Sequence, residues 1–256
     1  LFFEEMIFHD KILLLRDTFI DFLPWREFAA TSIKNGELPL WNPYSRFGQP
    51  FIAEPQSAVF YPLNFLFYVL PLSSAYKCFI ISHVFLSGVF MYLLMKQWQV
   101  SRISSLVSAV IFMFNGSIIS KLEFLSFVST IIWTPLIFLT LDKAISKKSL
   151  GFSVLTGIIM AVQIFAGHTQ TFYYVFLIAG CYWIFKLVMI FIVSRRFSDL
   201  FKPVFVLPLA TLTAISLSMI QLLPTFELLN LSIRSAAYNP ELDAASIHPF
   251  HLVTFL

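Results

Sequence analysis

Charged residues are scarce in this 256-residue chain, and their scarcity excludes most soluble folds. Asp, Glu, Lys and Arg make up 12% of the sequence, whereas 58% of the residues are hydrophobic. An ordinary soluble domain has roughly a quarter of its residues charged, so the polar residues here could hardly cover a water-exposed surface. The main solvent of this chain is therefore expected to be lipid.

Cysteine is nearly absent, and so are the common catalytic motifs. Cys78 and Cys181 both lie in apolar runs without the spacing of a metal site, which is typical of small core residues. No stretch matches a phosphate-binding glycine loop, a zinc-protease motif, a serine nucleophile elbow or a basic nucleic-acid surface. These absences exclude the corresponding enzyme classes and a nucleic-acid partner.

What the sequence does contain is a series of apolar runs, rich in the 31 Phe residues and in Leu, Ile and Val. Runs of about 18 to 25 residues have the length of a helix that crosses a hydrocarbon core of roughly 30 Å. Six spans are predicted, at Ser74–Met95, Ile103–Ser120, Phe124–Leu141, Leu150–Ala166, Thr171–Val193 and Pro203–Leu223. The predicted fold is an all-α polytopic membrane protein.

The basic residues alternate between the loops and so predict an orientation. The loops after the first, third and fifth spans carry Lys96 and Arg102, then Lys143, Lys147 and Lys148, then Arg195, Arg196 and Lys202. The other short loops carry only Lys121. Because cytoplasmic loops hold the excess of Lys and Arg, the first set is assigned to the cytoplasm, and the acidic residues, apart from Asp142 and Asp199, face outside.

This topology divides the chain into three parts. Residues 1–72 are predicted to form an outer segment, 73–229 the six-helix transmembrane region, and 230–256 the start of a further outer segment. The absence of a signal-peptide pattern and the abrupt ends indicate a piece of a longer protein, with an earlier spanning helix expected before Leu1.

Two local patterns are predicted within the outer segment. Pro24–Lys34 reads as a short surface helix that ends at Gly36 and has Trp25, Phe28, Ala29 and Ile33 on one face. Six Pro and Gly residues between Pro39 and Pro62 forbid a long regular element there. Apolar residues predict that this stretch is an ordered loop; they are Leu38, Leu40, Trp41, Phe47, Phe51, Phe60 and Tyr61.

Asp17 and Asp21 are the first candidate site residues. Four residues apart, they would share one face of a helix near the outer membrane surface. Together they could hold a divalent cation with water and a substrate phosphate, or one of them could act as a general base. The alternative is a solvated face, or Asp17 as a helix cap beside Arg16.

Further candidates follow the later spans. His168 and Gln170, in an outer turn made tight by Gly167, could hold a phosphate or a sugar hydroxyl, or the turn could satisfy only its own backbone. Glu227 and Arg234 follow the last span, where Arg234 could bind a phosphate or anchor at headgroups. His83, Asn115 and Glu123 read rather as hydrogen-bonding partners between helices or in connectors.

A family resemblance is carried by the loop sequence NGELPLWNPY at residues 35–44. It continues in GQP at 48–50, AEPQ at 53–56, FYP at 60–62, GHTQ at 167–170, QLLP at 221–224 and SIR at 232–234, with Arg16-Asp17 upstream. These motifs resemble the bacterial YfhO-type membrane proteins, which are similar to the GT-C class of glycosyltransferases. The resemblance implies a GT-C-like helical bundle with a long, ordered first outer loop that contains short juxtamembrane helices.

The same resemblance implies an activity and roles for residues. The expected enzyme sits in the bacterial cytoplasmic membrane and transfers a sugar from a polyprenyl-phosphate carrier to an envelope polymer, lipid or protein on the outer side. Asp17 takes the place of the catalytic acid. The resemblance does not require an acid at Asp21, so a divalent cation held by Asp17 and Asp21 is expected from their spacing alone. The implied substrate-binding residues are Trp41, Asn42, Gln56, His168, Gln170, Glu227 and Arg234.

Two other functions are compatible with the same sequence. A transporter or flippase of lipid-linked sugars would use the intramembrane His83 and the polar groups near helix ends. A non-catalytic envelope assembly factor would use the loop around Trp41 and Tyr44 to dock a partner. The first would move its substrate without forming a product, and the second would not need Asp17.

Overall fold

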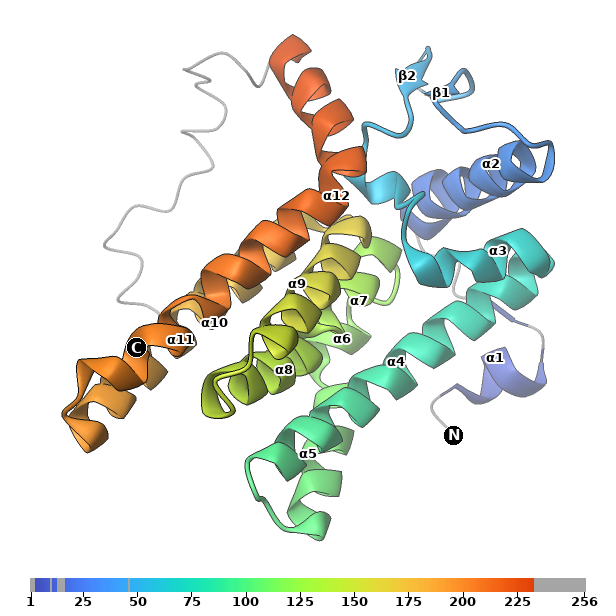
Figure 1. Ribbon diagram of the computed structural model, residues 1–256. Helices are drawn as coiled ribbons and strands as arrows, with labels where there is room; N and C mark the ends of the chain where they lie inside the picture. Colours follow the sequence, from blue (N-terminus) through green and yellow to red (C-terminus); the bar gives the residue numbers. More distant parts are fainter. Residues whose placement is uncertain (1–2, 10, 13–16, 46, 233–256) are drawn as a thin grey trace, which may run out of the picture.

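The computed structural model describes residues 3–9, 11–12, 17–45 and 47–232, which form a bundle of helices with an irregular segment at one end (Figure 1). The helices of the irregular end are α1 (Glu4–Phe8), α2 (Leu23–Lys34) and α3 (Phe65–Val69). The bundle comprises α4 (Leu72–Gln97), α5 (Arg102–Met113), α6 (Gly116–Ile119), α7 (Leu125–Ile131), α8 (Thr134–Ser146), α9 (Leu150–Phe165), α10 (Thr169–Ser194), α11 (Phe201–Val204) and α12 (Val206–Leu231). The predicted all-α polytopic fold is confirmed.

Five helical segments of the described chain are long and apolar enough to cross a membrane. They are Leu72–Gln97, Arg102–Ile119, Leu125–Ser146, Thr169–Ser194 and Phe197–Leu231. The fourth predicted span is the shorter apolar helix α9, whose 16 residues give a length of about 24 Å. The protein is therefore a multi-pass membrane protein, in which α9 packs among longer neighbours.

Two predicted spans contain breaks that the hydropathy did not reveal. Asn115 separates α5 from α6 because its side chain accepts a hydrogen bond from the N–H of Ile118 and so starts a new helix. Pro135 lies in the first turn of α8, where its missing N–H is tolerated, and α7 ends just before it. Each break leaves the chain running in the same general direction, so the number of helical passes is unchanged.

The tightest packing in the bundle joins α9 to α12. A Cβ atom at Gly157 would lie 2.4 Å from the carbonyl oxygen of Ala210, so only glycine permits this approach. Toward its C-terminal end, where it contains Pro224, α12 bends and reaches the irregular segment (Figure 1). The last spanning helix therefore joins the membrane region to that segment.

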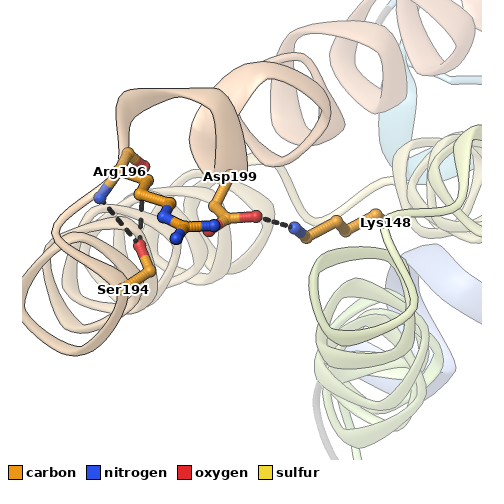
Figure 2. A network of polar contacts seen from close by, with 4 residues as sticks. All are labelled: Lys148, Ser194, Arg196 and Asp199. Atoms are coloured by element: carbon orange, nitrogen blue, oxygen red, sulfur yellow. Dashed lines mark hydrogen bonds and ion pairs between the residues drawn. The ribbon is translucent and has the colours of Figure 1, made fainter.

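The two ends of the bundle differ in charge and structure. At one end, called here the loop end, the irregular segment meets the turns that follow α6 and α9: the Thr18 hydroxyl donates to the carbonyl of Glu123 at 2.9 Å. At the opposite end, the basic end, Lys148 Nζ lies 2.6 Å from the Asp199 carboxylate (Figure 2). This contact ties the turn after α8 to the short helical turn before α11 (η4, Phe197–Leu200).

The basic end also contains a buried carboxylate. Asp142 on α8 is 4% exposed and accepts hydrogen bonds from Gln97 of α4 and Tyr182 of α10, at 3.0 and 2.6 Å. Lys186 of α10 supplies the counter-charge at 2.8 Å. The two acids assigned to this end by the sequence, Asp142 and Asp199, are thus both paired with lysines.

The irregular segment is an ordered loop, as predicted, but its anchors differ in part from those expected. Short strands β1 (Trp41–Asn42) and β2 (Gln49–Pro50) pair antiparallel, and single 3-10 turns follow (η2, Pro55–Ser57; η3, Pro62–Asn64). Phe51 and Tyr61 are fully buried, whereas four expected anchors are exposed: Leu38, Leu40, Trp41 and Phe47. The expectation was wrong for these four because the β1–β2 hairpin projects away from the core that holds Phe51.

Helix α2 confirms the predicted short helix and adds a residue to its buried face. Trp25 and Ala29 are buried as expected, and Phe28 and Ile33 are partly buried. Arg26 shares that face and is 1% exposed. Its position four residues after the buried Phe22 and three before Ala29 is the helical spacing that could have identified it.

Candidate functional site

An acid-lined cavity, called here the acid cavity, lies at the loop end. Its volume is about 290 Å³, and its walls include three carboxylates, those of Asp17, Asp21 and Glu54. Asp21 lies in a π-helical turn (η1, Thr18–Phe22) that runs directly into α2, and Asp17 is the residue that precedes this turn. Such turns recur at functional sites because they alter the spacing of side chains along a helix. Here the spacing brings both aspartates to the same cavity.

The carboxylates of the acid cavity lack basic partners in the described part of the chain. No described Lys or Arg forms an ion pair with Asp17, Asp21 or Glu54. The described residues also contain no group of three or more His, Cys, Asp or Glu side chains close enough to hold a metal ion. The cavity therefore presents hydrogen-bond acceptors that solvent or a ligand must satisfy.

Trp25 forms an apolar part of the wall of the acid cavity. The side chain lines the cavity and is only 6% exposed, and its indole Nε1 has no hydrogen-bond partner among the described residues. A buried N–H without a partner costs free energy, about 1 to 3 kcal/mol for a typical polar group. Trp25 therefore packs against the cavity while its indole N–H stays enclosed within the protein.

Arg26 holds the chain at Gln56 and Ser57, next to the acid cavity. Its guanidinium donates to the carbonyl oxygen of Ser57, and the carbonyl of Gln56 lies 3.5 Å away. Burial lowers the pKa of Arg26 to about 10, and the nearby Tyr68 and Tyr61 oppose that shift. A buried cation that bonds to main-chain carbonyls fixes their position more firmly than an exposed one would.

The spanning helices hold the same segment from the other side. The Gln221 side chain of α12 donates to the carbonyl of Ile52 at 2.8 Å, and the Thr225 hydroxyl donates to the carbonyl of Ala53 at 2.9 Å. On α7, the hydroxyl of Ser126 donates to Gln56 Oε1 at 3.0 Å. Residues 52–57 are therefore clamped between α2 and the bundle.

The turn after α9 completes this clamp. Gly167 has a φ of +90°, and a Cβ atom there would lie 2.1 Å from the carbonyl oxygen of Pro55. Both facts require glycine, since other residues rarely adopt that φ and would displace the loop. Gly167 thus lets the turn after α9 lie directly against the carbonyl of Pro55.

A second cavity, called here the middle cavity, lies on the other side of the clamped segment. Its volume is about 570 Å³. Glu54 and Gln56 line both this cavity and the acid cavity. Gly167 and Thr169 form another part of its wall, and Thr225 of α12 closes it. The two cavities therefore meet at Glu54 and Gln56.

An apolar groove follows the middle cavity into the membrane region. It has a volume of about 380 Å³ and lies between α9, α10 and α12, with Phe172, Phe176 and Leu222 in its walls. Thr169 lines both this groove and the middle cavity. A further apolar hollow of about 390 Å³ shares Phe176 with the groove and extends to Trp183. Polar and apolar spaces thus form one series from Asp17 into the bundle.

His168 stands at the polar end of the apolar groove. Its Nδ1 accepts a hydrogen bond from the N–H of Thr171 at 3.2 Å and so caps α10. Burial lowers the pKa of His168, and the positive charge of Lys121 lowers it further, so the neutral ring is favoured. His168 thus bonds to a backbone N–H of its own turn through Nδ1, and the side chain also lines the groove.

The other residues proposed from the sequence are distributed around this site. Gln56 lines both the acid cavity and the middle cavity. Trp41 is 56% exposed, and Asn42 is buried, where its side chain accepts a hydrogen bond from the N–H of Tyr44 at 2.9 Å. Gln170 is exposed and bonds to the Tyr174 hydroxyl at 3.0 Å. None of these contacts joins Trp41, Asn42 or Gln170 to Asp17.

Two candidates near the last helix are not part of the described cavities. Glu227 is exposed on α12 and is absent from the walls of all five described hollows. Arg234 lies outside the described residues. The structure therefore connects Asp17 to the His168 region only through the middle cavity, and not in one shared pocket.

Glu54 and Arg26 are ionisable residues of this site that the sequence interpretation did not select, and the polar residues Ser126, Thr169, Gln221 and Thr225 were not selected either. Glu54 was part of the quoted AEPQ motif, and an acid between apolar residues and a proline was a usable signal. His83 is an internal partner as expected, because it contacts the Tyr61 hydroxyl at 2.8 Å. For Asn115 the expected bond between helices is wrong: its side chain bonds within its own span, to the carbonyl of Phe112 at 2.6 Å and to the N–H of Ile118 at 3.0 Å.

Comparison with known proteins places the chain in a family. Residues 57–250 match the family model described as "Bacterial membrane protein YfhO". The chain belongs to the YfhO family. No curated protein and no solved structure matches it. The family match begins at Ser57, so Asp17, Asp21 and Glu54 precede it, whereas the turn at Gly167 and the groove-forming helices lie within it.

Proposed function

We propose that this YfhO-family protein is a membrane glycosyltransferase that moves a sugar from a polyprenyl-phosphate carrier to an envelope acceptor. The observation that carries the proposal is the series of spaces from the acid cavity, through the middle cavity, to the apolar groove. A donor with a lipid chain, a phosphate and a sugar has the same order of apolar, charged and hydroxyl-rich parts. The protein offers a matching environment for each.

The proposed arrangement follows from charge and polarity. The isoprenoid chain would occupy the groove between α10 and α12, because apolar side chains form nearly all of its wall. Its phosphate would lie in the middle cavity near Thr169 and His168, away from the repulsive carboxylates of the acid cavity. The acceptor would enter the acid cavity.

In the proposed reaction Asp17 acts as the general base. An acceptor hydroxyl attacks the anomeric carbon, the bond from that carbon to the phosphate oxygen breaks, and the lipid phosphate leaves with the electron pair. Asp17 takes the hydroxyl proton, a task for which its lack of a basic partner keeps the carboxylate available. His168 would stabilise the departing phosphate, and so would Arg234, which lies outside the described residues.

The side of the membrane follows from the loop charges. Lys and Arg gather at the basic end, so that end is proposed to face the cytoplasm and the cavities the outside. A divalent cation between Asp17 and Asp21 is compatible with their shared cavity. A flippase remains the second candidate, because a groove that opens along the membrane would also suit a lipid in transit.

A transfer assay separates these functions. The full-length protein is reconstituted in liposomes with a polyprenyl-phosphate hexose labelled in its sugar and a mixture of envelope acceptors. The glycosyltransferase predicts that label moves into a product that is no longer attached to the lipid carrier. Movement of the intact labelled lipid between leaflets, without any product, would establish the flippase instead.

A further inference from the structure

In the clamped segment, residues 52–57, Glu54 is the ionisable residue whose side chain lines both the acid cavity and the middle cavity. It is partly buried and lines the acid cavity beside Asp17 and Asp21 as well as the middle cavity beside Thr169. We infer that Glu54 is a second catalytic residue, whose carboxylate faces the anomeric carbon of the transferred sugar. The inference rests on the proposed function and adds a role that Asp17 does not fill.

The position of Glu54 is the first step of the argument. If the donor phosphate lies in the middle cavity and the acceptor in the acid cavity, the bond that is made and the bond that is broken meet at the wall between them. Among the described residues, Glu54 and Gln56 are the two that form this wall. Only Glu54 carries a charge there.

The rigidity of Glu54 is the second step. The carbonyls of its neighbours Ile52 and Ala53 are held by Gln221 and Thr225 of α12, and Arg26 holds the far side of the segment. Glu54 Oε1 also accepts from the N–H of Gln56 at 3.4 Å, which caps the short turn η2. A charge fixed in advance stabilises a transition state better than one that must reorganise.

The chemistry of the cavity is the third step. Sugar transfer develops positive charge on the sugar ring, and a fixed carboxylate stabilises that charge. Three carboxylates without an ion-pair partner among the described residues also suit a neutral, hydroxyl-rich ligand, since its hydroxyls can donate hydrogen bonds to them. The leaving phosphate, by contrast, would be repelled from this side.

The division of roles between the two acids follows. Asp17 receives the proton of the acceptor hydroxyl, while Glu54 stays ionised and stabilises the ring as the carbon–phosphate oxygen bond breaks. The balance of the reaction is unchanged, because the acceptor oxygen forms one bond to carbon, the phosphate oxygen loses one, and no further reactant is needed. Glu54 therefore acts on the transition state and not on donor binding.

The test compares Glu54→Gln with Glu54→Asp and the control Glu37→Gln in the liposome assay. Gln keeps an oxygen that can cap η2 but removes the charge, whereas Asp keeps the charge on a shorter side chain. Glu37 is exposed in the turn after α2 and lines none of the described cavities. For Glu54→Gln we expect kcat to fall about 100-fold with the KM for the donor unchanged.

Each outcome decides the inference. Partial activity of Glu54→Asp, with wild-type activity in Glu37→Gln, would support the need for a charge at this position. If Glu54→Gln fails to fold, the kinetics of Glu54→Asp decide: the inference then requires a lower kcat with an unchanged KM for the donor. Wild-type kcat in Glu54→Gln would overturn the role of Glu54 and leave the glycosyltransferase intact. Absence of product from the wild-type protein would reject the proposed function, and this inference with it.

Discussion

The acids at the two ends of the molecule stand in opposite environments. At the basic end, Asp142 pairs with Lys186 and Asp199 pairs with Lys148 (Figure 2). At the loop end, Asp17, Asp21 and Glu54 gather around one cavity with no ion-pair partner among the described residues. The first kind of acid joins helices, and the second kind faces a space that a ligand can enter.

This difference indicates that the paired acids of the basic end contribute to stability, whereas the acids of the loop end contribute to function. A carboxylate bridged to a lysine has little freedom to take a proton, and its loss is felt mainly in the packing of helices. The three carboxylates of the acid cavity join no helices through ion pairs among the described residues and instead face a space that a ligand can enter, which favours a role in binding or catalysis. Substitutions at the two ends should therefore affect different measurements.

The largest expected effect is on activity at the loop end. Asp17→Asn should lower sugar transfer by about 10²- to 10⁴-fold, because the amide cannot accept the acceptor proton. Its melting temperature should stay at the wild-type value, since no ion pair is lost among the described residues. The rate of product formation and a thermal melt check both statements. Intact transfer by Asp17→Asn would remove the catalytic base from the proposal.

The next effect tests whether the clamp positions the site. In Gly167→Ala, the new Cβ would approach the Pro55 carbonyl to 2.1 Å at a φ of +90°, so residues 54–56 must shift. Misplacement of a site by about 1 Å can cost 100-fold in rate, and we expect a loss of that order in transfer. Gly180→Ala is the matched control, because a Cβ there meets nothing within 4 Å. Equal activity of the two variants would show that the clamp does not position the site.

The third effect is on stability at the basic end. Asp142→Asn removes the counter-charge of Lys186 and should lower the free energy of unfolding by about 1 to 3 kcal/mol, less than for a fully buried pair because Lys186 is partly exposed. Adding Lys186→Met should recover part of the loss, and transfer by the folded protein should remain near the wild-type rate. A loss of transfer that exceeds the loss of folded protein would mean that the two ends are coupled.

The sequence was sufficient for the fold because membrane spans are long, local and apolar. The approximate limits of α4 and α10 follow from hydropathy, and α2 follows from its Pro24 start and its Gly36 stop. The predicted end of the last span at Leu223 was wrong, because α12 continues through Pro224 to Leu231 and includes Glu227. The breaks before α6 and α8 are less visible, since one side-chain cap or one proline decides them within an apolar run. Local signals thus predict helices better than interruptions of helices.

The candidate site was only partly predictable because it depends on contacts between distant segments. Asp17 and Asp21 are neighbours on one turn, so their shared cavity could be expected. The contact of Thr225 with Ala53 joins residues 172 positions apart, and no local pattern indicates it. Glu54 acquires its position through that contact, whereas Trp41 is left exposed by a hairpin whose direction the sequence did not specify.

A smaller effect should appear as pH dependence at the turn before α10. Because burial and Lys121 lower the pKa of His168, the unfolded chain takes up its proton first as the pH falls below the ordinary value of 6.5. The stabilisation by neutral His168 should be complete above that pH and decline as the pH falls through the lowered folded-state pKa. His168→Asn keeps a cap without titrating, so its melting temperature should change less with pH. Equal pH dependence in both proteins would contradict this role.

The smallest effect is expected at the exposed pair of the basic end. Lys148 and Asp199 are both partly exposed to solvent, and ion pairs of this kind contribute little because water screens them (Figure 2). Asp199→Asn should therefore leave the melting temperature unchanged within error, in contrast to Asp142→Asn. If the two variants lost equal stability, pairing itself would matter at this end, and burial would not explain the difference. If only Asp142→Asn is destabilised, burial decides which of the paired acids supports the bundle.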